Sequence, residues 1–501
     1  KILILFFLLA FGSTGLAQLS KVHYIPPLTS GPSNADPIDQ WFYISTPIKG
    51  DVSFKIKPVG STSDQETSYI VNNANPKKIL ISNAGYSQLF QDPSTTSVVT
   101  NNKGYIIESQ DVIYVSIRMN AGGFAQAGAL VSKGNNALGK IFRIGTYDNK
   151  GNSSQANYLN FFSVMATEDQ TTVNLTSNNT TGLVIQNYSG QFPVENIKLN
   201  KGESYTVAIK PIDSDGNKDG LIGTLVSADK NVVVNTGSAN GSFGNGGARD
   251  YGIDQIVGLD KVGKEYIFVK GAGANSFENI LLVAHYDNTK IKINQQSSLE
   301  ATVINKGEYL IIEGDKYTDG NMYVNSSEDV FAYQGIGGTT SEANQGMFFV
   351  PPLSCESRGD INNIALIDEI GDNTLTGGIT VVTKGTATIL INNVDIGSQP
   401  AGITVDGPIT VIGKNEYVTY KVTGLSGNVS VSSNDELYCA YYNQNSSAAS
   451  GSFYAGFSST PNVSLSLTAS SLGSCISSEG VSNVNFEISN SGSYDSFQWV
   501  K

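Results

Sequence analysis

The sequence has 501 residues, enough for several buried cores, but only 15% of them are charged, against about 25% in an average soluble protein. Its 53 glycines accompany many Asn, Ser and Thr residues, a composition typical of short strands joined by polar turns. The net charge of -13, without a basic stripe, excludes a nucleic-acid backbone or an anionic membrane surface as the main partner.

The first seventeen residues predict a signal peptide. Lys1 precedes the apolar run ILILFFLLAF, and the small-residue pattern Gly15-Leu16-Ala17 comes before Gln18. This run is too short to span a bilayer as a helix, and no later run reaches eighteen apolar residues. We therefore expect a secreted or cell-surface protein without a membrane span. The first residue is not Met and the ending FQWVK reads as an interrupted strand, so we also expect further modules beyond residue 501.

Recurring phrases organise the rest of the chain. One phrase, a lysine turn followed by tyrosine, occurs at Lys103, Lys201, Lys306 and Lys414, at intervals of 98, 105 and 108 residues. Where glycine follows the lysine, we expect that glycine in a left-handed conformation and the tyrosine at the start of a strand. A second phrase starts with serine and a short polar turn and then becomes apolar: SQDVIYVSI, SADKNVVVN, SSEDVFAYQG and SSNDELYCAYY. Phrases that keep one order at a common period predict internal repeats.

The runs between these turns favour strands over helices, because they are short, β-branched and bounded by turn residues. Six or seven strands in about 105 residues match the size of a β-sandwich, whereas a propeller blade takes about 40 to 50 residues. We predict an all-β fold of four imperfect repeats, sandwich-like modules in series, with a propeller-like array as the alternative. The predicted domains are a signal peptide at 1–17, β repeats at 18–137, 138–259, 260–352 and 353–462, and an incomplete immunoglobulin-like module at 463–501.

Two double-proline phrases, YIPPLTS at Tyr24–Ser30 and FVPPLSC at Phe349–Cys355, lie at the first and last of these joints. Consecutive prolines remove two backbone donors and keep the preceding residue extended. Each phrase is therefore expected to end a strand where one repeat meets the next.

The loop IDSDGNKDG is the best candidate for a metal site. Asp213, Asp215, Asn217 and Asp219 stand at alternate positions, which can turn successive oxygens toward a calcium ion. Lys218 and Thr224 occupy positions where the helix-loop-helix calcium motif has glycine and glutamate, so a solvated acidic turn is the alternative. We expect no other cofactor.

The sequence offers little for catalysis. His23 and His285 lie outside any nucleophile motif, and no Cys and His cluster has the spacing of a zinc site. A carboxylate pair for glycoside hydrolysis would most plausibly be Asp250 and Asp254, in GARDYGIDQ, although this stretch also reads as the entrance to the next repeat. We therefore expect a protein that is not an enzyme.

The sequence has three cysteines, so in an exported chain at least one of them has no disulfide partner within these residues. Cys475 opens the last segment, where alternating Val484, Phe486 and Ile488 resemble the start of an immunoglobulin-like module, so its partner is expected beyond residue 501. Cys355 and Cys439 would then be a possible disulfide, and three buried free thiols are the alternative.

Five phrases along the chain carry a resemblance to a known family. HYIPPL, DGLIGTLVSADKNVVVNTG, DQIVGLDKVGKEYIFVKG, ILLVAHYDNTKIKI and QGMFFVPPLS together resemble the amino-terminal domain of the IgG Fc-binding protein family, over about residues 18 to 460. The resemblance implies binding rather than catalysis. It also implies long secreted surface proteins of gliding bacteria, exported by type IX secretion, with immunoglobulin-like modules. No residue pattern for antibody binding can be matched here.

Two functions are consistent with these observations. The first is adhesion or ligand binding, with contact surfaces in loops rich in Tyr, Asn, Ser and Gly, namely NTGSANGSFGNGG from Asn235 and YYNQNSSAASGSFYAGF from Tyr441. These stretches are alternatively flexible linkers. The ligand would be a protein or a glycan, which the sequence does not identify. The second function is a secreted polysaccharide-processing enzyme or its carbohydrate-binding accessory.

Overall fold

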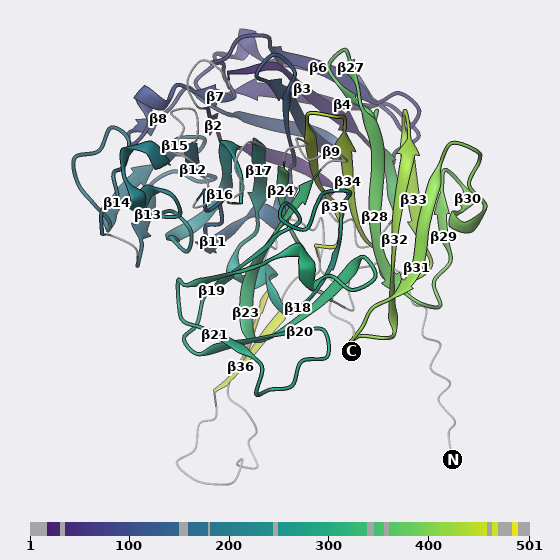
Figure 1. Ribbon diagram of the computed structural model, residues 1–501. Helices are drawn as coiled ribbons and strands as arrows, with labels where there is room; N and C mark the ends of the chain where they lie inside the picture. The colour runs from purple at the N-terminus through teal and green to yellow at the C-terminus, as the bar shows by residue number, and fades with distance from the viewer. Residues whose placement is uncertain are drawn as a thin grey trace, which may run out of the picture. The chain divides into compact units, whose positions relative to one another are not determined.

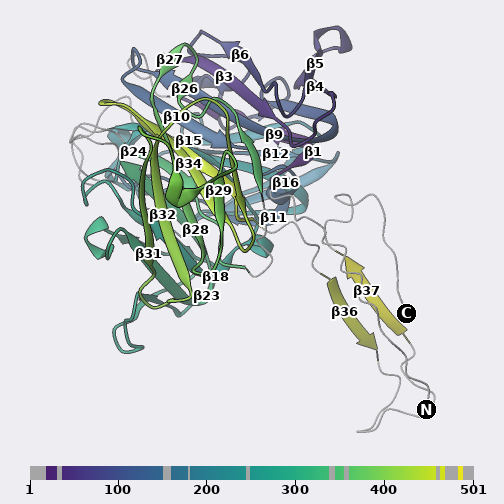
Figure 2. The ribbon, with the colours of Figure 1, turned by 90° about the vertical axis from the view of Figure 1, so that its right-hand side faces the viewer.

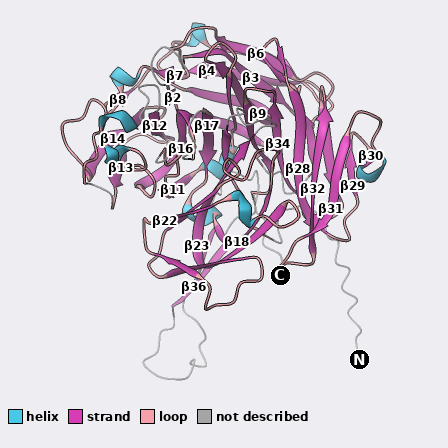
Figure 3. Cartoon of the chain, viewed as in Figure 1, coloured by secondary structure: helices cyan, strands magenta, loops and turns pink. Residues whose placement is uncertain are grey.

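The computed structural model describes residues 18–30, 36–149, 159–178, 181–243, 249–337, 345–354, 360–457, 463–468 and 483–488. The predicted signal peptide lies outside these residues. The chain divides into two compact units, Lys1–Ser458 and Ser459–Lys501, which are described separately. Among the described residues there is no α-helix, and none of the elements could cross a membrane as a helix. The predicted all-β fold is confirmed (Figure 3).

Four successive groups of strands, which we call modules 1 to 4, make up the first unit (Figure 1). Module 1 holds β1 (Ser20–Ile25), β2 (Leu28–Thr29), β3 (Pro37–Ser45), β4 (Val52–Pro58), β5 (Thr67–Val71), β6 (Lys77–Ser82), β7 (Phe90–Gln91), β8 (Val99–Thr100), β9 (Tyr105–Ala121) and β10 (Gln126–Val131). Module 2 holds β11 (Gly139–Arg143), β12 (Leu159–Ala166), β13 (Thr171–Thr176), β14 (Val194–Leu199), β15 (Ser204–Ile209), β16 (Leu225–Gly241) and β17 (Asp250–Ile256).

Modules 3 and 4 continue the series. Module 3 holds β18 (Gly263–Val269), β19 (Ile280–Ala284), β20 (Thr289–Ile293), β21 (Thr302–Ile304), β22 (Tyr309–Ile312), β23 (Asn321–Gly337) and β24 (Gln345–Phe349). Module 4 holds β25 (Ile361–Ile364), β26 (Glu369–Ile370), β27 (Asn373–Thr374), β28 (Thr376–Lys384), β29 (Ile389–Ile391), β30 (Val394–Asp395), β31 (Thr404–Thr410), β32 (Tyr417–Leu425), β33 (Val429–Ser433), β34 (Tyr438–Gln444) and β35 (Ala449–Ala455).

Short 3-10 turns and a separate hairpin complete the described elements. The turns are η2 (Ser63–Gln65), η3 (Pro93–Thr95), η4 (Gly134–Ala137), η5 (Pro211–Asp213), η6 (Asp215–Asn217), η7 (Leu259–Lys261), η8 (Gly314–Lys316) and η9 (Ile396–Ser398). In the second unit, β36 (Val463–Thr468) and β37 (Asn483–Ile488) form an antiparallel pair (Figure 2). The strand expected around Val484 is therefore present, whereas Cys475 lies outside the described residues.

One strand order recurs in the first three modules. The sheets run β5-β4-β9-β3-β6, β14-β13-β16-β12-β15 and β21-β20-β23-β19-β22, and two further strands of each module pair with its long strand. In module 4 the same set is split, since β33 and β34 lie in two different sheets. The first three modules thus share one pattern of strand pairing, and module 4 departs from it.

A 17-residue strand, β9, β16 or β23, links the two halves of each of the first three modules. In module 1 the first half of β9 pairs with β4 and the second half pairs with β3. The polar turn predicted at Ser109, Ser227 and Ser326 is therefore wrong, because neighbouring strands hold the backbone extended on both sides of the polar residues. In module 4 the prediction is right, since β33 ends at Ser433 and β34 begins at Tyr438.

The lysine turns were predicted to put a glycine in a left-handed conformation before a strand. Gly104, Gly202 and Gly307 have φ values of 86°, 84° and 78°, which confirms that prediction. The copies after Lys201, Lys306 and Lys414 enter equivalent strands, β15, β22 and β32, but the copy after Lys103 enters the long strand β9. The interval of 98 residues between Lys103 and Lys201 therefore does not separate equivalent strands of two modules.

The double prolines lie at contacts between modules, as expected. β1 ends at Ile25, and the carbonyl oxygen of Pro26 accepts a hydrogen bond of 2.8 Å from Asn235 Nδ2 in module 2. β24 ends at Phe349, and after the second proline pair the amide of Ser354 donates to the hydroxyl of Tyr438 in module 4, at 2.6 Å.

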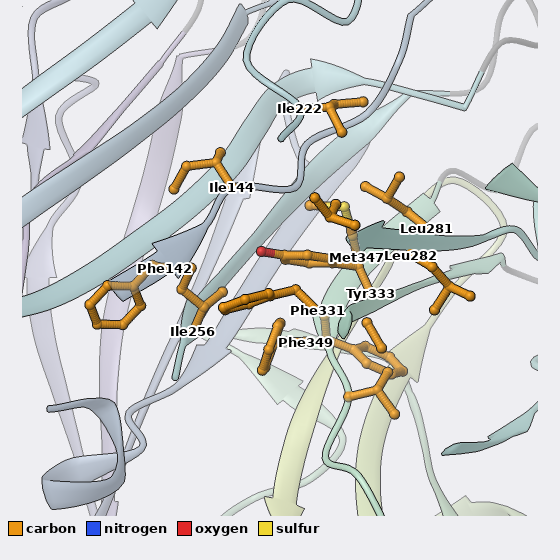
Figure 4. Close-up of a cluster of buried hydrophobic side chains, with 14 of the residues drawn as sticks. Phe142, Ile144, Ile222, Ile256, Leu281, Leu282, Phe331, Tyr333, Met347 and Phe349 are labelled. Atoms are coloured by element: carbon orange, nitrogen blue, oxygen red, sulfur yellow. The ribbon is translucent and has the colours of Figure 1, made fainter. Parts of the chain in front are cut away.

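The modules share their cores instead of forming separate sandwiches in a line. One buried cluster joins modules 2, 3 and 4, a second joins modules 1 and 2, and a third joins modules 1 and 4. Figure 4 shows part of the first cluster, where Phe142 and Ile256 of module 2 approach Phe331, Tyr333 and Phe349 of module 3. Because module 4 also contacts module 1, the arrangement is closed, as in the propeller-like alternative.

The last strands of the modules, β10, β17, β24 and β35, meet at the centre of this arrangement. β10 contacts β17 and β35, and β24 contacts the same two strands. Each central strand carries a glycine near its start, Gly128, Gly252, Gly346 or Gly451. An added Cβ at Gly128 would lie 2.7 Å from Tyr251 Cβ, so the small residue permits close approach between modules.

The close packing at Gly252 predicts that Gly252→Ala destabilises the protein. The new Cβ would lie 2.7 Å from Met347 Cβ in the neighbouring module, and such overpacking typically costs about 1–3 kcal/mol. Urea unfolding measures the change. Gly50→Ala is the matched control, since nothing lies within 4 Å of a Cβ there. Equal stabilities of the two variants would contradict the role of Gly252.

Candidate functional site

Asp250, one of the two carboxylates considered for catalysis, lies inside the core. It is 0% exposed and accepts hydrogen bonds from the backbone amides of Ala127, Tyr251 and Ala449, the last at 2.9 Å. Burial raises its pKa well above the usual range, and these amide donors oppose the shift. The carboxylate therefore joins β17 to β10 and β35, and it has no access to a polymeric substrate.

Asp254, the second carboxylate, forms a buried ion pair. Its Oδ1 lies 3.0 Å from the ammonium nitrogen of Lys133, and the two side chains are 1% and 0% exposed. The amides of Gln255 and Phe349 donate to the carboxylate at 2.9 Å, and the hydroxyl of Ser452 donates at 3.0 Å. Burial raises the pKa of Asp254 and lowers that of Lys133, and the attraction between the two groups opposes both shifts. Residues from all four modules thus meet in one polar network.

His23 belongs to the same buried region. Its Nδ1 lies 2.9 Å from Ser132 Oγ, and its Nε2 lies 3.0 Å from the carbonyl oxygen of Ile113 and 3.2 Å from that of Ser20. Burial lowers its pKa to about 4. His285, at the contact between modules 2 and 3, is half-buried, and burial also lowers its pKa to about 4. The structure thus separates the two histidines: His23 lies in the buried region, and His285 lies at the contact between modules 2 and 3. Among the described hydrogen-bond partners of either ring there is no exposed nucleophile.

The four residues of the predicted calcium loop turn toward different partners. The side chain of Asn217 is buried and bonds to the backbone of Val184, and Asp213 accepts from Gln186 at 2.6 Å. Asp215 pairs with Lys218 at 2.9 Å, and Asp219 accepts from the hydroxyl of Tyr309 at 2.6 Å. Within the described ranges, no group of three or more His, Cys, Asp or Glu could hold a metal ion. Calcium binding here stays a prediction.

Cys439 is fully buried, and burial raises the pKa of its thiol. Its predicted partner Cys355 lies outside the described residues, so their pairing also stays a prediction.

The two stretches expected to be binding loops are largely buried strands. Asn235 to Gly241 belong to β16, and most of the stretch from Tyr441 belongs to β34 and β35, all of them buried. Small residues are needed there because an added Cβ at Gly237 would lie 2.6 Å from the carbonyl oxygen of Gly252, and one at Gly451 would lie 2.5 Å from that of Tyr441. In the described residues 235–243 and 441–457, the composition therefore indicates tight packing and not an exposed contact surface.

A surface hollow of about 370 Å³ is the best candidate for ligand binding. It lies beside the end of β20 and is lined by Ile293, Asn294, Gln295, Gln296, Glu300, Lys316, Thr318 and, from module 4, Ile412. Hydrogen bonds from Ser297 lower the pKa of Glu300, and a hydrogen bond to Asp315 raises that of Lys316, so both groups are charged at neutral pH. Amides and one charge of each sign suit a polar ligand with both donors and acceptors. Sequence patterns gave no signal for this hollow, because its residues come from three separate segments, residues 293–300, residues 316–318 and Ile412.

Burial of His23 predicts a loss of stability at acidic pH. Its pKa of about 4 lies below the unfolded value of 6.5, so the unfolded chain binds the proton more tightly, and stability falls as the pH drops from about 6.5 to 4. The shift corresponds to about 3 kcal/mol. Denaturant unfolding of the native protein and of His23→Gln should diverge in pH dependence over this range, with the variant less pH-sensitive. Because the pKa of His285 is also lowered to about 4, His285→Gln should reduce the pH sensitivity over the same range, and the double variant should be less pH-sensitive than either single variant. Parallel curves for the native protein and His23→Gln would contradict the assignment.

Comparisons with known proteins identify a family. Among solved structures, an anti-sigma factor domain-containing protein is 11% identical, with 69% of this chain and 83% of that chain covered and a TM-score of 0.11. Salmonella α2-macroglobulin reacted with methylamine is 8% identical, with 90% and 34% covered and a TM-score of 0.12. These likenesses are too weak to carry an argument, and no curated protein matches. A family model described as IgGFc binding protein matches residues 127–462, more than half of the chain, which therefore belongs to the IgGFc binding protein family.

Proposed function

We propose that this protein is a secreted or cell-surface adhesion protein that binds a protein or glycan ligand without catalysing its conversion. The family match carries the proposal, because the family is described by a binding activity and the match covers modules 2 to 4. Immunoglobulin Fc is one ligand to test, since the family description names it. Secretion in gliding bacteria by the type IX route remains part of the proposal.

The architecture supports a binding role. The central strands and their polar network are buried and shared among the modules, so the surface turns project from a rigid support. The hollow beside β20 lies among such turns. In contrast, the two carboxylates that would serve a glycoside hydrolase accept hydrogen bonds from backbone amides inside the core.

Binding without turnover can be tested directly. The purified chain is applied to glycan arrays and to protein arrays that include immunoglobulin Fc, and incubated in parallel with the bound polysaccharides to detect new reducing ends. We expect binding without hydrolysis. Turnover that Asp250→Asn or Asp254→Asn abolishes, in variants that still fold by circular dichroism, would overturn the proposal in favour of an enzyme.

A second experiment places the binding site. Gln295→Ala and Lys316→Ala remove polar groups from the hollow, and loss of one hydrogen bond to a charged or polar partner corresponds to about 3- to 30-fold in affinity. Leu299→Ala is the matched control, because Leu299 is 99% exposed on the same loop but does not line the hollow. Affinities for the ligand found on the arrays are measured by calorimetry. If all three variants bind as the native chain does, the site lies elsewhere.

A further inference from the structure

Arg143 is a buried cation that pairs with no carboxylate in the described part of the chain. The residue is 1% exposed; its Nη1 donates to the carbonyl oxygen of Gly223 at 2.8 Å and its Nε donates to His285 Nδ1 at 3.4 Å. Its Nη2 is buried and has no hydrogen-bond partner among the residues that the structure describes. Burial lowers the pKa of Arg143 to about 10, which leaves the guanidinium charged at neutral pH. A buried charge whose donors are incompletely satisfied is costly, so the position calls for a compensating group.

Equivalent positions in the other modules show that the fold does not require this charge. Arg143 ends β11 and stands opposite Leu225, the first residue of the long strand. Ile25 stands opposite Tyr105 in the same place in module 1, and Val269 stands opposite Asn321 in module 3. Both of these residues are apolar and buried. The arginine therefore replaces an apolar side chain at one joint only among these three modules.

Arg118, a second buried arginine of the described residues, shows how the protein stabilises a buried guanidinium with aromatic rings and carbonyl oxygens. The guanidinium carbon of Arg118 lies 4.1 Å from the ring centre of Tyr43 and 4.8 Å from that of Tyr441, and its two terminal nitrogens donate to three carbonyl oxygens of module 4. Its Nε lacks an acceptor, but both terminal nitrogens have one. Arg143 has neither aromatic ring above it nor an acceptor for Nη2 within the described structure.

The turn of module 3 beside Arg143 carries the cation Lys306 and the carboxylate of Asp287, whose Oδ1 accepts a hydrogen bond of 3.1 Å from the amide of Lys306. Arg143 and Lys306 both lower the pKa of His285, after burial, and no carboxylate contributes to that shift. Arg143 donates through Nε, so His285 Nδ1 is the acceptor and the ring proton of the neutral tautomer lies on Nε2. Lys306 is exposed, and its turn covers the arginine, since a Cβ at Gly307 would lie 3.2 Å from Arg143 Nη1. The joint thus combines a guanidinium, an imidazole donor and an ammonium.

We propose that Arg143, His285 and Lys306 form a binding site for one compact oxyanion, a sulfate or a carboxylate group, at the joint between modules 2 and 3. A guanidinium matches the geometry of both groups. The overall charge of -13 disfavours an extended polyanion, so the ligand is a single charged group, free in solution or at the end of a sugar chain. This site is separate from the hollow beside β20, and the inference does not depend on the proposed function.

The purified chain can be tested with sodium sulfate, sodium glucuronate and glucose, at constant ionic strength set with sodium chloride. We expect sulfate or glucuronate to raise the midpoint of thermal unfolding above that in chloride alone, while glucose does not. Sulfate also stabilises folded proteins generally, so a rise supports the site only where it saturates with anion concentration and is lost in Arg143→Met. A saturating effect of sulfate alone indicates a free ion as the ligand, and a stronger effect of glucuronate indicates a sugar acid. An equal midpoint in all four solutions would overturn it.

Two variants assign the effect to these residues. Arg143→Met places an apolar side chain where Ile25 and Val269 stand, so the fold is expected to persist and to gain stability without anions, while anion affinity falls about tenfold or more. Lys306→Ala removes an exposed charge and should weaken binding about two- to fivefold. Lys201→Ala, in the equivalent turn of module 2, is the control and should bind normally. Native anion affinity in both Arg143→Met and Lys306→Ala would overturn the assignment, and Lys306→Ala still tests it if Arg143→Met does not fold.

Discussion

The closed arrangement of the four modules depends on the buried ion pair between Lys133 and Asp254. Asp254 lies on β17, Lys133 follows β10, and the carboxylate also binds the amide of Phe349 on β24 and the hydroxyl of Ser452 on β35. A buried pair of this kind adds little net stability against an apolar replacement, but removal of one partner costs about 3–5 kcal/mol. We therefore expect the pair to contribute mainly to specificity, because its contacts join residues of all four modules at one point.

Because the last strands of the four modules meet at the centre, neighbouring modules share hydrophobic cores. Each central strand is buried on both faces, so a single module cannot cover its own last strand. Apolar side chains of modules 1 and 4 form one cluster although their sequences are far apart, and Arg118 of β9 binds three carbonyl oxygens of module 4. The modules consequently stabilise one another, and residues 1–458 form one compact unit.

The same burial separates supporting residues from residues available to a ligand. Polar groups of the centre, including Asp250, His23 and Asp254, have partners within the protein. The hollow beside β20 is instead built from turns at the surface. Arg143 differs from both groups, because it is buried like a supporting residue and yet lacks an acceptor for one of its nitrogens.

The sequence by itself determined the all-β class, the glycine turns after Lys201 and Lys306, and the family. Alternating apolar residues fix one face of a strand, and a left-handed glycine fixes a turn, so Gly202 and Gly307 could be placed from local pattern alone. Local pattern failed where distant strands decide the outcome. Ser227 looked like a turn residue, but strands on both sides keep β16 extended through it.

Only the tertiary structure decided which polar residues are buried and what they contact. The stretches from Asn235 and Tyr441 have the composition of exposed loops, yet they pack at the centre because small residues let neighbouring backbones approach. Lys133 and Asp254 are 121 positions apart, and no spacing rule connects them. Pairing of this kind depends on how four modules close on one another, which local sequence does not encode.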